Sequence, residues 1–266
     1  MVFGWLPASL LGQDDTTIKP QLRRELAQYK AADFMSFDPA VEPPPSDLPA
    51  VCKFDGWRSP RGSKLCQKCR RPLEMRSKYE VWLDALIVSY SGDRYGIRIG
   101  ASYRDVLKWI PAMRPYPRPR DISSHVFLDV LYALTHVVYT LNDYGHYRIR
   151  PDLLPQEFTY LRQNLQQAIA LHDAETTGEF LDTLKAFGLG RSDPVIQKGM
   201  KYLLDTQRAD GTWGPPGLED AYTLYHSAWT GIDGLKECCW QGERISFPDL
   251  EPLLESMQQA GPPRHH

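Results

Sequence analysis

The chain has 266 residues, and its 31 Lys and Arg nearly balance its 33 Asp and Glu, giving a net charge of −2. This balance removes any global electrostatic argument for nucleic-acid binding. No apolar run approaches the roughly 20 residues that cross a bilayer, and residues 1–11 lack the basic start of a secretory signal. We therefore expect a soluble, cytoplasmic protein without a membrane span, and its oligomeric state stays open. Five cysteines, an odd number, do not indicate a disulfide framework.

Residues 1–77 are predicted to form an irregular N-terminal arm. A helix is expected between Lys19 and Ala32, and three consecutive prolines at 43–45 then forbid a helix and favour an extended polyproline conformation. The arm ends where the apolar residues take up helical spacing, at Lys78.

The arm contains three cysteines, Cys52, Cys66 and Cys69, the last two in a Cys-x-x-Cys spacing. One such pair with a single distant cysteine is an incomplete zinc site, because a structural zinc takes four ligands. Asp55 is available as the fourth, although a carboxylate is unusual in such sites. A structural zinc ion and free or redox-linked thiols are the two alternatives.

The chain after residue 77 has the pattern of a helical domain. The first helix starts at Lys78 and is expected to end at Gly92, and Ser102 with Asp105 forms a capping box that opens the next. Further helices are predicted at about 122–142, 155–171, 174–187, 193–206, 218–239 and 247–258. Strand signals are nearly absent, so an all-α domain is expected over residues 78–260.

One heptapeptide, QRADGTW at residues 207–213, has the character of a signature. Asp210 and Gly211 supply the positive φ that stops a helix, and Gln207 is placed to reach unpaired backbone groups at that helix end. Trp213 would cover the turn. The heptapeptide resembles the Gln-x-x-Asp-Gly-x-Trp repeat of the superfamily that contains squalene and terpene cyclases and the β subunits of protein prenyltransferases. That resemblance implies an α/α toroid, a ring or partial ring of helical hairpins, in which the motif is stabilising.

A displacement of ninety residues aligns the segments 129–140 and 219–230, in which an acid, Tyr, Leu, His, an aromatic residue and Thr recur. His136 falls on His226 in this alignment. Because repeats of one structural unit place equivalent residues alike, we expect the two histidines at equivalent positions on two helices.

The two histidines are the leading candidates for chemistry, since a histidine within an apolar helix needs a polar partner. Glu179 and Asp182 are spaced i, i+3 on a helix that lies between them in the sequence. Inner helices of a toroid converge on one cavity. Fe(II), Zn(II) or another divalent metal could therefore be bound there by His136, His226 and one of Glu179, Asp182 or Asp220. The alternatives are buried hydrogen bonds for the histidines and solvated positions for the acids.

The segment Tyr225-His226-Ser227 resembles the one that carries the zinc-ligand histidine of prenyltransferase β subunits, which implies a zinc-ligand role for His226 alone. The Asp-x-Cys pair that completes that site has no counterpart upstream, which argues against thiol activation and protein prenylation. The Asp-x-Asp-Asp acid of class II terpene cyclases is also missing from the domain, which argues against a cyclase of that type.

Tyr139, Asn142, Tyr225 and Asp220 are further candidates for catalytic positions. Aromatic residues gather on the two helices that carry the histidines, and around a cavity such residues bind apolar or cationic molecules. Asn142 follows His136 by one to two turns and is suited to orient a ligand. No nucleotide-binding fingerprint occurs, which disfavours hydride transfer from a Rossmann-bound cofactor.

Three functions remain open at this point. The first is a metal-dependent enzyme that acts on a hydrophobic or aromatic small organic or peptide substrate in the central cavity of a toroid. The second is a non-catalytic helical-repeat binding or accessory protein of a biosynthetic complex. The third is a metal-free enzyme similar to terpenoid cyclases. Metal content separates the first from the other two.

Overall fold

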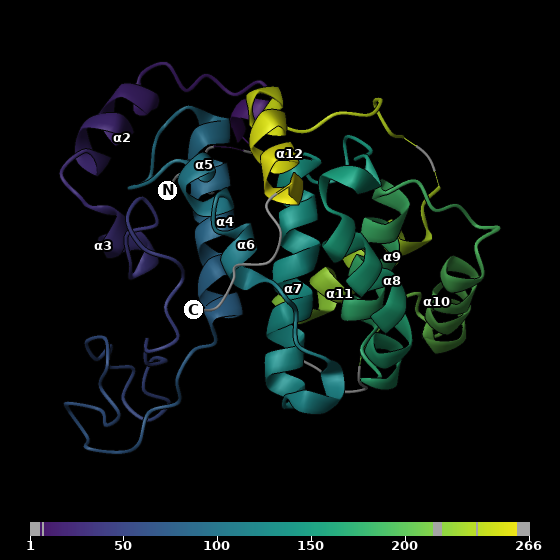
Figure 1. The fold of residues 1–266 in the computed structure, drawn as a ribbon, viewed down its shortest axis with the longest axis horizontal. Coiled ribbons are helices and arrows are strands. Elements are labelled where there is room, and N and C mark those ends of the chain that lie inside the picture. Colours follow the sequence, from purple (N-terminus) through teal and green to yellow (C-terminus); the bar gives the residue numbers. More distant parts are fainter. Residues whose placement is uncertain (1–5, 7, 215–219, 238, 260–266) are drawn as a thin grey trace. The chain divides into compact units, whose positions relative to one another are not determined.

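The computed structural model describes residues 6, 8–214, 220–237 and 239–259 (Figure 1). Within these residues helices are the only regular elements, accompanied by four isolated β-bridges. The predicted all-α class is therefore confirmed. The chain forms two compact units, residues 1–115 and 116–266. The helix that starts at Lys78 belongs to the first unit, although the sequence pattern groups it with the later helices.

The first unit is built around one long helix. Its helices are α2 (Ile18–Leu26), α3 (Ala31–Met35), α4 (Lys78–Tyr95), α5 (Tyr103–Leu107) and α6 (Ile110–Met113). Helix α4 packs against α3 and α5. Its Ser77 cap accepts a hydrogen bond from the backbone N–H of Glu80, and the expected capping box of Ser102 and Asp105 opens α5.

Two helix boundaries in this unit differ from the prediction. The helix expected from Lys19 to Ala32 is split into α2 and α3. Helix α4 runs past Gly92 to Tyr95 and is capped by Gly96, which adopts a φ of 76°. Gly92 has another role: a Cβ there would lie 2.7 Å from the carbonyl oxygen of Ile97, so the glycine allows the following loop to pack closely on the helix.

The second unit consists of helices joined by short turns. They are α7 (Ser124–Leu141), α8 (Pro155–Ala170), α9 (Ala174–Ala186), α10 (Pro194–Thr206), α11 (Ala221–Leu235) and α12 (Glu251–Gln259), with short 3₁₀ turns at 119–121, 151–153 and 248–250. Helix α9 is the centre of this unit and packs against α7, α8, α10 and α11 (Figure 1). The helix expected over 218–239 is shorter, because Asp220 caps its start and it ends at Leu235; residues 218, 219 and 238 lie outside the described residues, as does residue 260 at the expected domain end.

Helices α9 and α11 approach each other closely at two glycines, Gly178 and Gly234. A Cβ on Gly178 would lie 2.4 Å from the carbonyl oxygen of Thr230, and one on Gly234 would lie 2.8 Å from Cα of Gly178. Neither site has room for a larger residue. Because Gly178 stands between Glu175 and Glu179 on α9, this crossing sets the distance from those two glutamates to α11.

The heptapeptide at 207–213 forms the turn that follows α10. Gly211 has a φ of 85°, as expected for a helix stop. The Gln207 amide donates to the carbonyl of Gly211 (3.0 Å), so it closes the turn and leaves the helix carbonyls to another donor. One such donor is the indole N–H of buried Trp213, which bonds the carbonyl of Leu203 at 2.8 Å; the Thr206 hydroxyl also donates to this carbonyl, at 3.4 Å. The motif thus stabilises a helix end.

One helix among the described residues, α7, is long and apolar enough to cross a membrane by length and composition alone. Because 67% of this helix is buried inside the structure, the core of the second unit accounts for its apolar character equally well.

Candidate functional site

A cavity of about 200 Å³ opens between α7, α9 and α11 in the second unit. Its walls contain six of the eight residues that the sequence singles out: His136, Tyr139, Glu179, Asp182, Tyr225 and His226. The remaining wall residues are Tyr144, Tyr222, Trp229, Thr230 and Asp233. The two histidines therefore face one space from α7 and α11, on either side of the central helix α9.

Three of the wall and flanking residues place their ligand atoms close together. One atom each from Glu175, Glu179 and His226 lies within 4.8 Å of the other two. Glu175 is absent from the sequence-based candidates. It was detectable, because it precedes Glu179 by four residues and so lies on the same helix face. Glu175 also lies in the first turn of α9, where an acidic residue commonly interacts with the helix dipole. The sequence alone therefore does not indicate its contact with His226.

Glu175 links the two histidine-bearing helices. Its Oε1 accepts a hydrogen bond from the Tyr132 hydroxyl of α7 at 3.0 Å and lies 3.1 Å from Nδ1 of His226 on α11. Contact with Glu175 raises the pKa of His226 against the opposing effect of burial. Burial acts to raise the pKa of Glu175, but the contacts with His226 and Tyr132 outweigh it and hold this pKa below its ordinary value. The pair is therefore an ion pair when His226 is protonated.

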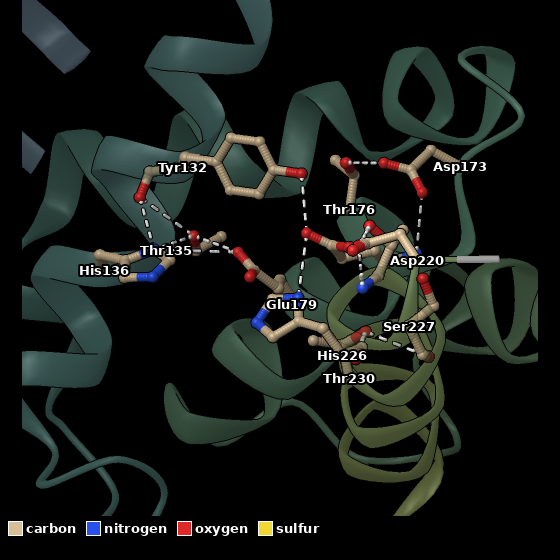
Figure 2. A network of polar contacts seen from close by, with 12 residues as sticks. Tyr132, Thr135, His136, Asp173, Thr176, Glu179, Asp220, His226, Ser227 and Thr230 are labelled. Atoms are coloured by element: carbon tan, nitrogen blue, oxygen red, sulfur yellow. Dashed lines mark hydrogen bonds and ion pairs between the residues drawn. The ribbon is translucent and has the colours of Figure 1, made fainter. Parts of the chain in front are cut away.

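Glu179 is almost completely buried, with 2% of its surface exposed. The Thr135 hydroxyl donates to its Oε2 at 2.6 Å. Burial nevertheless dominates and raises the pKa of Glu179 to about 8. Figure 2 shows its carboxylate between the rings of His136 and His226. The charged form of the Glu179 carboxyl group is therefore poorly solvated, and either a proton or a bound cation would neutralise it.

His136 is held in one orientation by its own helix. Its Nδ1 lies 2.9 Å from the carbonyl oxygen of Tyr132, so the ring donates from Nδ1. Burial lowers the pKa of His136 to about 4, which keeps the ring neutral. A neutral ring that donates from Nδ1 carries its lone pair on Nε2, and no hydrogen bond among the described residues engages that atom. His136 lies outside the three-residue group, with Nδ1 3.9 Å from Oε2 of Glu179.

Asp182 lines the cavity but also stands outside the three-residue group. Burial raises its pKa to about 7, although Lys236, whose Nζ lies 3.9 Å from Oδ1, acts in the opposite direction. Oδ1 has no hydrogen-bond partner among the described atoms. Asp182 is therefore a second buried carboxyl group next to the site.

Two of the proposed catalytic residues serve the backbone and do not reach the cavity. Asp220 caps α11 and accepts a hydrogen bond from the backbone N–H of Thr223 at 2.8 Å. Asn142 follows the last turn of α7 and accepts one from the backbone N–H of Gly145 at 2.9 Å. Side chains of this type commonly cap helices and turns, and the sequence does not distinguish that use from a catalytic one.

Aromatic side chains of α11 form the rim of the cavity. Tyr222, Tyr225 and Trp229 are each about half exposed, although all three line the cavity. The Tyr222 ring stacks on the ring of His226, with centroids 5.2 Å apart. On the opposite helix, the Tyr139 hydroxyl donates to the backbone carbonyl of Glu179 at 3.4 Å. The entrance is therefore aromatic, and the interior is polar.

The first unit contains a second group of ligand-type residues. Cys52, Cys66 and Cys69 lie together as the sequence suggests, and Asp55 joins them, with the four ligand atoms within 4.8 Å of one another. No disulfide links the three thiols. The predicted alternative of a metal site in the arm is thus geometrically available.

Comparison with known proteins provides no template for either group. The chain matches no protein-family model, no curated protein and no solved structure. Functional inference therefore depends on the chemistry of the residues that line the cavity.

Proposed function

We propose that the second unit is a metal-dependent enzyme. A divalent ion, Fe(II) or Zn(II), would be held by Glu175, Glu179 and His226, with its open positions toward the cavity. The substrate would be a hydrophobic or aromatic small organic molecule or peptide side chain. The observation that carries the proposal is the convergence of these three ligand atoms within 4.8 Å at the wall of a cavity.

The ligand set fits such an ion in three respects. Metal–oxygen and metal–nitrogen bonds of about 2.1 Å place neighbouring ligand atoms about 3.0 to 3.4 Å apart, and Nδ1 of His226 lies 3.1 Å from Oε1 of Glu175. That nitrogen is buried and makes no hydrogen bond of good geometry among the described residues. Glu179 is a buried carboxyl group whose negative charge needs a cation. A metal ion would satisfy both groups at once.

The residues around the ion suggest how a reaction would proceed. A bound divalent ion supplies Lewis-acid activation or, if it is iron, redox chemistry. His136 is neutral and has a free ring nitrogen, so it would accept a proton from the substrate or a water molecule in the cavity. Thr135 and Tyr132 would hold Glu179 and His136 in place through their hydrogen bonds.

The cavity limits the size and polarity of the substrate. Its volume of about 200 Å³ accommodates a molecule of one or two rings or a short chain, since an apolar cavity of about 150 Å³ is enough for benzene. Tyr222, Tyr225 and Trp229 would bind the apolar part at the entrance. The polar wall on α9 would then face the reacting group.

We further propose that the helical hairpins of the second unit are part of an α/α toroid. Alternate helices, α7, α9 and α11, supply the cavity wall, while α8 and α10 pack on α9 and on each other. An inner and an outer row of alternating helices is the arrangement expected of such a ring. In this arrangement His136 and His226 would lie on the two inner helices that flank α9, as the ninety-residue repeat expects.

A metal-free acid–base enzyme is the second candidate. Burial raises the pKa of Glu179 to about 8 and that of Asp182 to about 7, so both are available as proton donors near neutral pH. Neutral His136 would then be the matching acceptor. This alternative needs no ion, and metal binding therefore separates the two candidates.

The test is calorimetric titration of chelator-treated protein with Zn(II) and, without oxygen, with Fe(II). We expect Glu179→Gln to lose a binding site that the wild type has, because an amide is a poor ligand for either ion. Glu255→Gln is the matched control, since Glu255 is an exposed residue of α12 that pairs with Arg150. Identical titrations of the wild type and Glu179→Gln would exclude the metal site and favour acid–base chemistry.

A further inference from the structure

Residues 49–76, which lie between α3 and α4 in the first unit, form an ordered loop with almost no apolar core. It has no helix, and its backbone makes two isolated bridges, Pro49 with Met75 and Leu65 with Pro72. Between residues 51 and 76, all of which the structure describes, the two buried residues are Cys52 and Cys66. The large apolar residues of this segment, such as Phe54 and Trp57, are exposed, so burial of apolar surface does not account for its order.

Two turns in this segment have the same backbone geometry. In the first, the N–H of Cys52 donates to the carbonyl of Trp57, and the N–H of Gly56 donates back to the carbonyl of Cys52 (3.0 and 2.9 Å). In the second, the N–H of Cys66 donates to the carbonyl of Arg71, and the N–H of Arg70 donates to that of Cys66 (2.8 and 2.9 Å).

The fifth residue of each turn has a positive φ, 68° at Gly56 and 63° at Arg70. An arginine in this conformation is unfavourable unless the surrounding structure requires it. The fourth residue is Asp55 in one turn and Cys69 in the other. The turns are therefore equivalent, and Asp55 occupies the position of a second cysteine.

We propose that the first unit carries a structural zinc ion held by Cys52, Asp55, Cys66 and Cys69. The spacing Cys-x₂-Asp-x₁₀-Cys-x₂-Cys is that of a two-turn zinc site with one cysteine replaced by aspartate. The ion takes the place of an apolar core and fixes the two turns against each other. This site is separate from the proposed metal site of the second unit and does not depend on it.

The distances within the cluster match the edges of a zinc tetrahedron. Zn–S bonds of about 2.3 Å and Zn–O bonds of about 2.0 Å give edges of about 3.8 Å between sulfurs and about 3.5 Å between sulfur and oxygen. Sγ of Cys52 lies 3.5 Å from Sγ of Cys69, and Sγ of Cys66 lies 3.6 Å from Oδ2 of Asp55. All four ligand atoms lie within 4.8 Å of one another, so only small adjustments would close the tetrahedron.

The cluster also has the chemistry of a closed structural site. Zinc prefers thiolate ligands and accepts one carboxylate, and four protein ligands leave no position for a substrate. Without a bound metal ion, three thiols this close together and not linked by a disulfide would be open to oxidation. Zinc binding protects thiolates because their lone pairs are engaged.

The experiment is cobalt substitution of the full chain, since Co(II) in a thiolate site absorbs strongly by charge transfer from sulfur. The wild type should show this absorption, and Zn(II) should abolish it. Asp55→Cys should keep the site and raise the absorption by about one third, because the thiolates increase from three to four. Cys66→Ser should lose most of it. Cys239→Ser is the control: Cys239 is exposed in the second unit, and its substitution should change nothing.

Three results would overturn the zinc site. These are a wild type without charge-transfer absorption, an absorption that does not rise in Asp55→Cys, and thiols of the cluster recovered as disulfides. Because Asp55→Cys replaces the carboxylate ligand by a thiolate and keeps four ligands, the test does not depend on a variant that fails to fold. His226→Ala should retain the full absorption whether or not the second unit binds metal. A second readout is trypsin cleavage at Arg61 and Lys64, which should begin when a chelator removes the ion.

Discussion

Nδ1 of His226 lies 3.1 Å from Oε1 of Glu175, and this contact joins α11 to the first turn of α9. It brings a ring nitrogen and a carboxylate to the separation of neighbouring ligands on one metal ion. Because Glu175 also accepts a hydrogen bond from Tyr132 of α7, one carboxylate connects three helices around the cavity.

The first prediction concerns the titration of His226 in chelator-treated protein. Glu175 raises the pKa of His226, while burial acts in the opposite direction. Replacing Glu175 by Gln removes the favourable charge and leaves burial, so the pKa should fall. The measurement is NMR titration of the His226 ring, with Glu255→Gln as the control. An unchanged pKa in Glu175→Gln would contradict the contact.

The second prediction concerns the crossing of α9 and α11. A methyl group on Gly178 would overlap the backbone at Thr230 and Gly231. Gly178→Ala should therefore lower the free energy of unfolding by about 1 to 3 kcal/mol, as overpacking of a core does. It should also weaken metal binding, because it separates His226 from Glu179. Thermal unfolding and zinc titration measure the two effects.

Gly190→Ala is the control for this substitution, since the space around Gly190 is open and its φ is not positive. If Gly178→Ala is as stable as Gly190→Ala, the close approach of the two helices is not present in solution.

A third prediction links Glu179 to the pH dependence of stability without metal. Burial raises its pKa in the folded protein to about 8, above the ordinary value of 4.5. The folded state therefore binds the proton more tightly than the unfolded state does. The resulting stabilisation is fully present below pH 4.5 and is lost as the pH rises through 8.

Glu179→Gln mimics the protonated carboxyl group at every pH. Compared with the wild type, chelator-treated Glu179→Gln should lose less stability between pH 5 and pH 8.5, by at least about 1 kcal/mol, since one pKa unit corresponds to about 1.4 kcal/mol. Urea unfolding at a series of pH values measures this difference. Parallel curves for the two proteins would show that Glu179 is not buried.

The fourth prediction tests the role of the heptapeptide. Trp213→Phe keeps most of the buried ring but removes the N–H that bonds the carbonyl of Leu203. The carbonyl would keep only the longer bond from the Thr206 hydroxyl, at 3.4 Å, so the substitution should cost about 0.5 to 1.5 kcal/mol of stability. Trp57→Phe is the control, because Trp57 is 45% exposed. Equal stability of the two variants would assign Trp213 a packing role alone.

The sequence predicted the helical class and much of the cavity, for physical reasons that can be named. Helix periodicity and caps such as Asp193 with Pro194 are local signals, and α10 begins where they indicate. The recurrence of His136 and His226 pointed to two helices, and both histidines line one cavity.

What the sequence did not predict depends on contacts between distant residues. Gly92 reads as a helix stop, but it lies inside α4 because the backbone at Ile97 packs against it. Asp220 reads as a ligand and is a helix cap. Glu175 reads as an ordinary surface acid, and only its distance to His226 reveals its partner.

The most direct test of the central claim is the metal content of purified, reconstituted and desalted protein, measured by plasma mass spectrometry. Wild type and His226→Ala are compared, with His125→Ala as the control because His125 is exposed at the start of α7. The group that contains His226 is one of two candidate metal sites among the described residues. We therefore predict that His226→Ala contains one metal ion per chain fewer than the wild type. His125→Ala should have the same metal content as the wild type. Equal metal content in wild type and His226→Ala would contradict the proposed metal site of the second unit.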